Sequence, residues 1–337
     1  MPFNITNSVG RYAKNGGINI DPFMVIGNDT GKIVTSADGN IWALKDMGTF
    51  ESINGIAYGA GLWVAVGNSS NLTWTSTNGT TWGSTPNTIF TQAGGIGFGK
   101  DGAGANLWVA VGETSFSGSS PIATSPNGTT WTTRTNVGLG TNCLADVAFG
   151  KDNLNNNLWV AVVEGNNGNT FASSPNGTDW TGRGIIIYNP RGVAFGKNDS
   201  GANLWVATGR ASGSNHIAIS SNGTTSWTGI SATGGITSGK SVAYGKDGSG
   251  VGLWVVVGSG GNSIATSTTG TAWTGRTQNG GVTTGQKVAY GLDSMGNGLW
   301  IVTGSGANSI ATSTNGINWT GKVVSGFTNG NSVAFKS

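Results

Sequence analysis

The chain has 337 residues, of which 61 are glycine and only 9% are charged, whereas an average globular protein has about 25% charged residues. Its 36% hydrophobic content and 14 tryptophans exclude a disordered chain, because disordered segments lack the aromatic residues needed to bury apolar area. The net charge is +3 without any run of Lys and Arg, which excludes the basic surface that nucleic-acid binding requires.

Several other classes of site and location are also excluded by the composition. Cys143 is the only cysteine, so neither an intrachain disulfide nor a cysteine-based metal site is possible. His216 is the only histidine and is predicted to be a loop residue, so we expect no metal and no cofactor. No stretch of about 18 apolar residues occurs, which predicts no membrane insertion. The first residues, MPFNITNSVGRYAKNGG, lack the apolar segment of a secretory signal peptide.

Three short motifs recur in a fixed order along the chain. FMVIGN at 23–28 and TSADGNIW at 35–42 are the first copies of the second and third motifs. The first motif, V-A-[FY]-G, follows as IAYG at 56–59 and IGFG at 96–99, and later copies begin at Val147, Val193, Val242 and Val288. The second motif, L-W-V-A-V-G, carries Trp63, Trp108, Trp159, Trp205, Trp254 and Trp300. The third motif, I-A-T-S-x-N-G-x-x-W, ends in Trp42, Trp82, Trp131, Trp180, Trp227, Trp273 and Trp319.

The composition of these motifs is typical of β-strands. Each motif is rich in Val, Ile, Trp and Thr and is bounded by Gly, Asn or Asp. The Asn-Gly step supplies the positive φ of a tight hairpin turn, and the W-T-G segment after it gives a fourth strand. The final tryptophans recur at intervals of 40, 49, 49, 47, 46 and 46 residues, which indicates stacked supersecondary units. The sequence therefore predicts an all-β fold, a seven-bladed β-propeller of four-stranded antiparallel blades, as one domain over residues 1–337.

The two ends of the chain offer different ways to close this ring. NSVAFKS at 331–337 is a further copy of the first motif with no second motif after it, and NSVGRY at 7–12 also resembles a first strand. We expect the C-terminal strand at 332–336 to complete the first blade. The N-terminal segment would then add to the same blade or to an edge.

The pattern T-S-x-[ND]-G-x-x-W in the third motif resembles the Asp-box, or BNR, repeat of sialidase-like β-propellers. The resemblance covers nearly the whole chain and implies a hairpin between the third and fourth strands of each blade. Asp38 keeps the acidic residue, whereas the other copies carry Asn78, Asn127, Asn176, Asn222, Thr269 and Asn315. The acid and glycine are also closer together than in the usual box, and the fifth blade has an extra residue before Trp227. In that family the box is a folding device, so the resemblance predicts architecture and says little about activity.

Sialidase-type catalysis, as the resemblance implies it, needs an arginine cluster, a Tyr–Glu pair and an acidic Asp. Glutamate occurs only at Glu51, Glu113 and Glu164, and glycoside hydrolysis needs two carboxyl groups about 5–10 Å apart. Scattered carboxylates do not favour that arrangement. We therefore predict that the protein is not an enzyme.

Four basic residues occupy one repeat position, just after the fourth strand. They are Arg134, Arg183, Arg276 and Lys322. Equivalent positions lie far apart around a ring, so these side chains are not expected to form one cluster. They are either solvated strand ends or a ring of equivalent binding contacts, and we keep them as candidate binding residues.

The repeated tryptophans and aspartates also allow more than one role. Thirteen of the fourteen tryptophans lie at the two periodic positions, which favours core packing over stacking on sugar rings. Trp74, in NLTWTS, stands where the repeats after it carry Ala. It therefore fills a local gap or marks a binding site peculiar to the second blade. The aspartates of the K-D-G loops are predicted to stabilise turns, because one carboxylate per loop is too few for calcium.

These observations favour a non-enzymatic structural or recognition propeller. The composition, rich in Gly, Asn, Thr and Ser, resembles that of phage tail-fibre and other virion surface proteins. That resemblance implies a component of a virion or an extracellular surface whose partners are other structural proteins of the assembly or surface glycans. Two alternatives stay open: a multivalent carbohydrate-binding lectin and a sialidase-like glycoside hydrolase.

Overall fold

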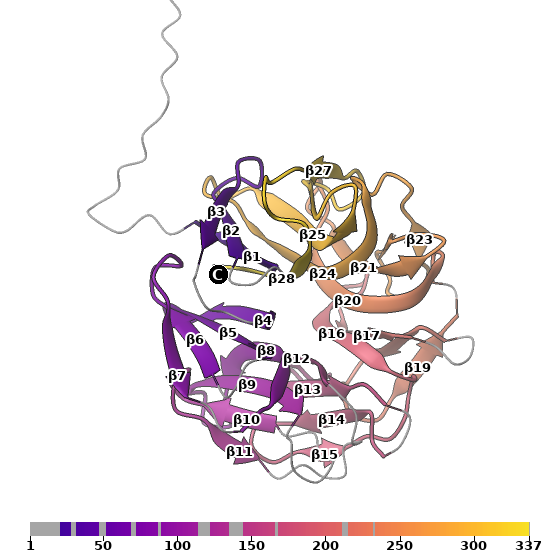
Figure 1. Cartoon of the computed structure of the whole chain (residues 1–337). Helices are drawn as coiled ribbons and strands as arrows, with labels where there is room; N and C mark the ends of the chain where they lie inside the picture. The colour runs from indigo at the N-terminus through magenta and orange to yellow at the C-terminus, as the bar shows by residue number, and fades with distance from the viewer. Residues whose placement is uncertain are drawn as a thin grey trace, which may run out of the picture.

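The computed structural model describes residues 21–27, 32–46, 52–68, 72–86, 89–113, 122–134, 144–165, 168–210, 215–231 and 233–336. In these ranges the chain forms seven antiparallel sheets of four strands each, and no helix. The sheets are arranged around a common axis as the blades of a propeller (Figure 1). The predicted seven-bladed, all-β architecture is confirmed. No helix that is long and apolar enough to cross a membrane was found in the described part of the chain.

Each blade contributes one strand to each of four concentric positions, and we number the blades one to seven in chain order. The innermost strands of blades one to seven are β28 (Gly330–Phe335), β4 (Ser52–Gly59), β8 (Gln92–Lys100), β12 (Leu144–Lys151), β16 (Pro190–Lys197), β20 (Ile236–Lys246) and β24 (Val282–Leu292). The second strands are β1 (Phe23–Gly27), β5 (Leu62–Asn68), β9 (Asn106–Glu113), β13 (Asn157–Val163), β17 (Asn203–Gly209), β21 (Gly252–Gly260) and β25 (Gly298–Gly306). The third strands are β2 (Lys32–Ser36), β6 (Leu72–Ser76), β10 (Ile122–Ser125), β14 (Phe171–Ser174), β18 (Ile217–Ser220), β22 (Ile264–Ser267) and β26 (Ile310–Ser313). The outermost strands are β3 (Ala43–Asp46), β7 (Gly83–Pro86), β11 (Thr132–Arg134), β15 (Thr181–Gly182), β19 (Trp227–Ile230), β23 (Thr274–Gly275) and β27 (Thr320–Lys322).

The C-terminal strand β28 completes the sheet of blade one and closes the ring. β28 pairs antiparallel with β1, with Phe335 opposite Phe23 and Val333 opposite Val25. β28 also contacts β24 of blade seven and β4 of blade two, so each innermost strand touches the innermost strands of both neighbouring blades. The segment at 7–12, the other candidate for closure, lies outside the described residues.

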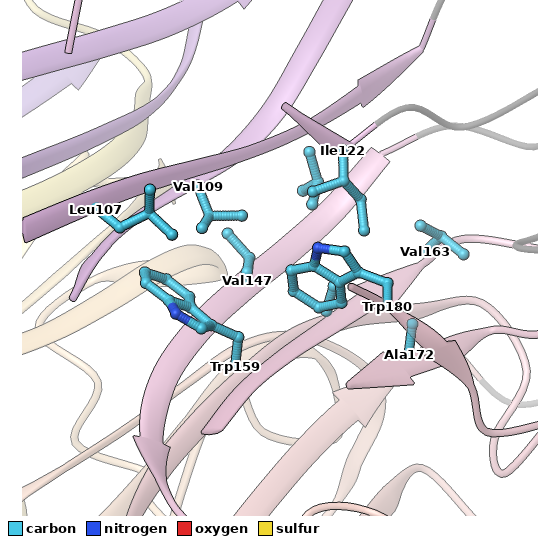
Figure 2. Packing of buried hydrophobic residues seen from close by; sticks show 10 residues of the cluster. Leu107, Val109, Ile122, Val147, Trp159, Val163, Ala172 and Trp180 are labelled. Atoms are coloured by element: carbon cyan, nitrogen blue, oxygen red, sulfur yellow. The ribbon is translucent and has the colours of Figure 1, made fainter. Parts of the chain in front are cut away.

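The apolar core lies between the blades. Figure 2 shows one such interface, in which Leu107, Val109 and Ile122 of blade three face Trp159 and Trp180 of blade four. Trp159 is completely buried, and its indole N–H donates to the carbonyl of Lys100 in blade three at 2.8 Å. The same bond recurs in three later pairs, Trp205 to Lys151, Trp254 to Lys197 and Trp300 to Lys246. The prediction that these tryptophans pack the core is confirmed.

A second contact joins neighbouring blades closer to the axis. In blades two to seven the aromatic ring of the first motif packs against the tryptophan of the second, with centroids 4.7–5.1 Å apart. The same ring covers the glycine of the preceding blade's first motif, so that a Cβ on Gly150 would overlap the ring of Phe195. Lys336, directly after the closing strand β28, stands in place of this glycine, and its Nζ lies 5.9 Å from the Tyr58 ring centroid.

The hairpin turn after the third strand satisfies its own backbone. In blade four the Ser174 hydroxyl accepts the N–H of Gly177 at 2.8 Å. Asn176 Oδ1 accepts the N–H groups of Thr178 and Asp179 at 3.0 and 2.9 Å. The positive φ of Gly177, 76°, matches the turn predicted for the Asn-Gly step.

The aspartates of the loops between first and second strands act in the same way. Asp152 Oδ1 accepts the N–H groups of Leu154 and Asn156 at 2.8 and 2.9 Å. Equivalent bonds are formed by Asp101, Asp247 and Asp293. The predicted turn-stabilising role of these residues is confirmed.

Candidate functional site

The four basic residues selected from the sequence lie on different blades and are not brought together. Three of them fold back on the third strand of their own blade, where Nε donates to a hydroxyl oxygen. These bonds are Arg134 to Thr124 at 2.7 Å, Arg183 to Ser173 at 2.8 Å and Arg276 to Thr266 at 2.9 Å. Burial lowers the pKa of both Arg183 and Arg276. Lys322 differs from all three, because its Nζ donates to Asn40 Oδ1 of blade one at 2.8 Å.

Trp74 lies inside the interface between blades one and two. It is 4% exposed and belongs to an apolar cluster that includes Met24, Ile33 and Trp63. A ring so deeply buried has no open face on which a sugar can stack. This placement favours the first of the two roles considered for Trp74, the filling of a local gap.

The axis of the ring gathers charged groups that the repeat analysis did not select. Innermost strands carry Arg191, Lys240, Gln286 and Lys287 at the one or two positions before the valine of the first motif. Asp146 occupies the equivalent position in blade four, and Glu164 directly follows β13. We call these six residues the channel mouth.

Ion pairs and hydrogen bonds connect the channel mouth. Lys287 Nζ lies 2.8 Å from Asp146 Oδ2, which joins blade seven to blade four. Arg191 contacts Glu164 through both Nε and Nη2, at 2.8 Å and 3.2 Å. Lys240 Nζ donates to Gln286 Oε1 at 2.9 Å.

Burial shifts the pKa of two of these groups. Desolvation raises the pKa of Glu164, although Arg191, Lys240 and Arg210 all oppose the shift. Desolvation and the nearby charge of Arg191 lower the pKa of Lys240, and Glu164 opposes this shift. Three cationic side chains, Arg191, Lys240 and Arg210, thus act on Glu164, and a fourth, Lys287, pairs with Asp146, so these two carboxylates are outnumbered by the cations around them.

The wall of the channel beyond the mouth is apolar. A cavity of about 340 Å³ on the axis is lined by first-motif residues of several blades, among them Ala57, Phe195 and Val333, and by Lys287 at the mouth. An anionic group at the mouth would therefore lie next to an apolar shaft. Among the residues described, no group of three or more His, Cys, Asp or Glu side chains is arranged to hold a metal ion.

The channel mouth was not predicted from the sequence, because the prediction used only the positions at which the repeats agree. Arg191, Lys240 and Lys287 stand beside the recurring first motif, at positions where its copies within the chain differ from one another. Aligning the seven copies on the valine of the first motif would have exposed this variation. At the two positions before this valine, some copies carry small residues and others carry charged or amide side chains, and this difference marks the site.

No protein-family model matches the sequence, and no match was found among curated proteins. Solved structures do match. The GH74 enzyme of Niastella koreensis is 18% identical with a TM-score of 0.52, over 88% of this chain and 44% of that one. Hydrazine synthase of Kuenenia stuttgartiensis is 9% identical with a TM-score of 0.52, over 92% and 100% of the two chains. Virginiamycin B lyase of Staphylococcus aureus is 13% identical with a TM-score of 0.51, over 89% and 93%.

These likenesses concern the fold alone. The chain spans less than half the length of the GH74 chain that it matches, and the matched proteins have different activities. The protein is thus a seven-bladed β-propeller.

Proposed function

We propose that the protein is a non-enzymatic recognition propeller that binds an anionic group of its partner at the channel mouth. The observation that carries the proposal is the excess of cationic side chains around Asp146 and Glu164 at the axis. Guanidinium and ammonium groups form charge-assisted hydrogen bonds with carboxylates, and partial burial strengthens such bonds. The ligand would be a carboxylate or sulfate group on a glycan or a protein.

At the channel mouth, binding is favoured over hydrolysis because both carboxylates, Asp146 and Glu164, form ion pairs. Asp146 is paired with Lys287, and Glu164 with Arg191. Each carboxylate is held by a cation, whereas a hydrolase needs one carboxyl group to donate a proton to the leaving group and a second to act on the opposite side.

The proposed setting is a surface assembly, either a virion or the outside of a cell. Its partners would be other structural proteins of the assembly or acidic surface glycans. The composition supports this setting, because few charges and much Gly, Asn, Thr and Ser are what the resemblance to virion surface proteins rests on.

We further propose that the hairpin turn after the third strand is a variant of the Asp-box. Asp38 Oδ1 accepts the N–H groups of Asn40 and Ile41 at 2.8 and 3.0 Å. Asn176 and Thr269 accept the equivalent N–H groups in their own blades. An amide or hydroxyl oxygen thus replaces the carboxylate, which supports a variant of the same folding device.

The test is an array of acidic and neutral glycans together with acidic peptides. We expect wild-type protein to retain acidic probes, less strongly as salt increases, and Lys240→Ala to lower that affinity about tenfold, the effect of about 1.4 kcal/mol. Arg134→Ala is the matched control, because Arg134 bonds within its own blade. Failure to retain any acidic probe, or equal binding by Lys240→Ala, would refute the proposal.

A further inference from the structure

A second, larger cavity lies at the opposite end of the molecule from the channel mouth. Its volume is about 870 Å³, and it is formed by loops of blades six, seven and one. Lys246 lines this cavity and Lys240 belongs to the mouth, six residues apart on β20, which corresponds to about 20 Å of strand. We call the cavity the rim groove. Its volume is in the range of known small-molecule sites, about 300–1,000 Å³.

Lys322 distinguishes this part of the ring from the equivalent places in blades three, four and six. In blades three, four and six the arginine at this register folds over the third-strand hydroxyl of its own blade. Lys322 leaves the equivalent hydroxyl, Thr312, and reaches across to Asn40 of blade one. Thr312 is consequently 6% exposed, against 1–2% for Thr124, Ser173 and Thr266, and it lines the groove.

The lining combines hydrogen-bond acceptors with donors. Asp38, Asp247 and Asp293 supply carboxylates, and Lys246, Lys322 and Asn318 supply ammonium and amide groups. Oδ1 of each aspartate accepts N–H groups of its own turn. The turns therefore hold the carboxylates in place before a ligand arrives, which reduces the entropic cost of binding.

The charge and polarity of the lining select the class of ligand. Three carboxylates and two lysines line the groove, so an anionic ligand is disfavoured here, in contrast to the mouth. Hydroxyl groups both donate and accept, and they match alternating carboxylate, amide and ammonium partners. Tyr290 and Leu299 add apolar surface to the same groove, against which the C–H face of a sugar ring can pack.

We propose that the rim groove is a binding site for a neutral saccharide. The site is independent of the channel mouth, because it lies at the other end of the innermost strands and its lining does not favour an anion. Asn318 and Lys322 are the residues on which specificity depends, since they come from one hairpin and both line the groove. Lys322 also reaches blade one through its bond to Asn40.

The test is an array of neutral oligosaccharides without carboxylate or sulfate groups, followed by calorimetric titration of the best probe. We expect wild-type protein to bind a neutral probe, and Asn318→Ala and Lys322→Ala each to weaken it about tenfold or more, as expected when about 1.4 kcal/mol or more is lost. Thr130→Ala and Arg183→Ala are the matched controls at the same registers of blades three and four, and we expect unchanged affinity for both.

Lys322→Arg separates the shape of the groove from its charge. An arginine at this register folds back on the third-strand hydroxyl, as Arg276 does on Thr266, so we expect binding to be lost while the thermal melting temperature stays unchanged. Absence of binding to every neutral probe would overturn the proposal, as would equal binding by the Asn318 and Lys322 variants. Loss of neutral binding in Lys240→Ala would also overturn it, because the saccharide would then lie at the channel mouth.

Discussion

Trp159 shows how much one side chain contributes to the joining of two blades. Its ring is fully buried among residues of blades three and four, and its N–H crosses the interface to Lys100. Both the apolar contacts and the hydrogen bond depend on the neighbouring blade being in place. Trp159 therefore stabilises the association of blades three and four, and not only the sheet to which it belongs.

Trp159→Ala should lower the free energy of unfolding by about 3–5 kcal/mol, because it removes a fully buried tryptophan from the interface and leaves a cavity. Urea denaturation followed by circular dichroism measures the loss. Trp159→Phe keeps much of the ring but not the N–H and should cost less. A loss below about 1 kcal/mol for the alanine variant would contradict the packing role.

Glu164 makes the proposed anion binding depend on pH. Its pKa is raised above the ordinary value of 4.5, chiefly by burial. As the pH falls from neutral through this raised value, Glu164 gains a proton, the mouth loses a negative charge, and Arg191 is released to hold a ligand. Affinity for an acidic ligand should therefore increase as the pH falls.

Glu164→Gln should remove most of this pH dependence. At neutral pH it should already bind an acidic ligand as tightly as the wild-type protein does at low pH. The sign for folding is the same: because the folded-state pKa is raised, the contribution of Glu164 to stability is present below its unfolded pKa and is lost as the pH rises through the folded value. The affinity of the wild-type protein and of Glu164→Gln for an acidic probe, measured from about pH 4 to about pH 8, checks this prediction. An equally steep profile in Glu164→Gln would place the titrating group elsewhere.

β28 is the strand on which closure of the ring depends. It pairs with β1 on one edge, and its Val333 belongs to the apolar cluster between blades seven and one. Removing it would leave an unpaired edge on β1 and expose the cluster to water. Both effects act on the same blade.

Deleting residues 332–337 should lower the melting temperature by roughly 10 °C or more, since a loss of 1 kcal/mol already shifts it by a few degrees in a chain of this size. Differential scanning calorimetry measures the shift. Lys336→Ala, which removes only the contact with the Tyr58 ring, should cost about 0.5–1 kcal/mol. Closure by β28 would be disproved by a truncated chain that melts at the wild-type temperature.

The strands were predictable because their determinants are local and repeated. The Gly177 turn needs only Ser174 and Asn176 beside it, and the tryptophans keep one register in every blade. The channel mouth was not predictable in this way, because Lys287 and Asp146 are 141 residues apart and meet only once seven blades close. The direction of the Lys322 side chain also depends on a neighbour, Asn40, that the ring brings next to it.

Across the whole ring, the Lys287–Asp146 pair ties blade seven to blade four without passing through the blades between them. The Asp146 side chain is 8% exposed, against 28% for Lys287. Removing the lysine alone therefore leaves a largely buried carboxylate without its partner, which is costly. The pair resists relative movement of opposite halves of the ring.

A double-mutant cycle with Asp146→Ala and Lys287→Ala should give a coupling energy of about 0.5–3 kcal/mol. The double variant should be less destabilised than the sum of the single variants, because it leaves no unpaired buried charge. Chemical denaturation of the four proteins supplies the values. Strict additivity would mean that the two charges do not act on each other in solution.

Ring closure by the last strand also has a consequence for synthesis. Phe23 of β1 cannot pair with Phe335 of β28 until Phe335 has been synthesised. At about 5–20 residues per second, the ribosome needs roughly 15–60 s to translate the residues between them. During that interval the inner edge of β1 presents unpaired N–H and C=O groups, the kind of edge that pairs with other chains. Neighbouring nascent chains on one messenger RNA are thus exposed to strand exchange, and conditions that slow translation should increase the yield of interlocked oligomers.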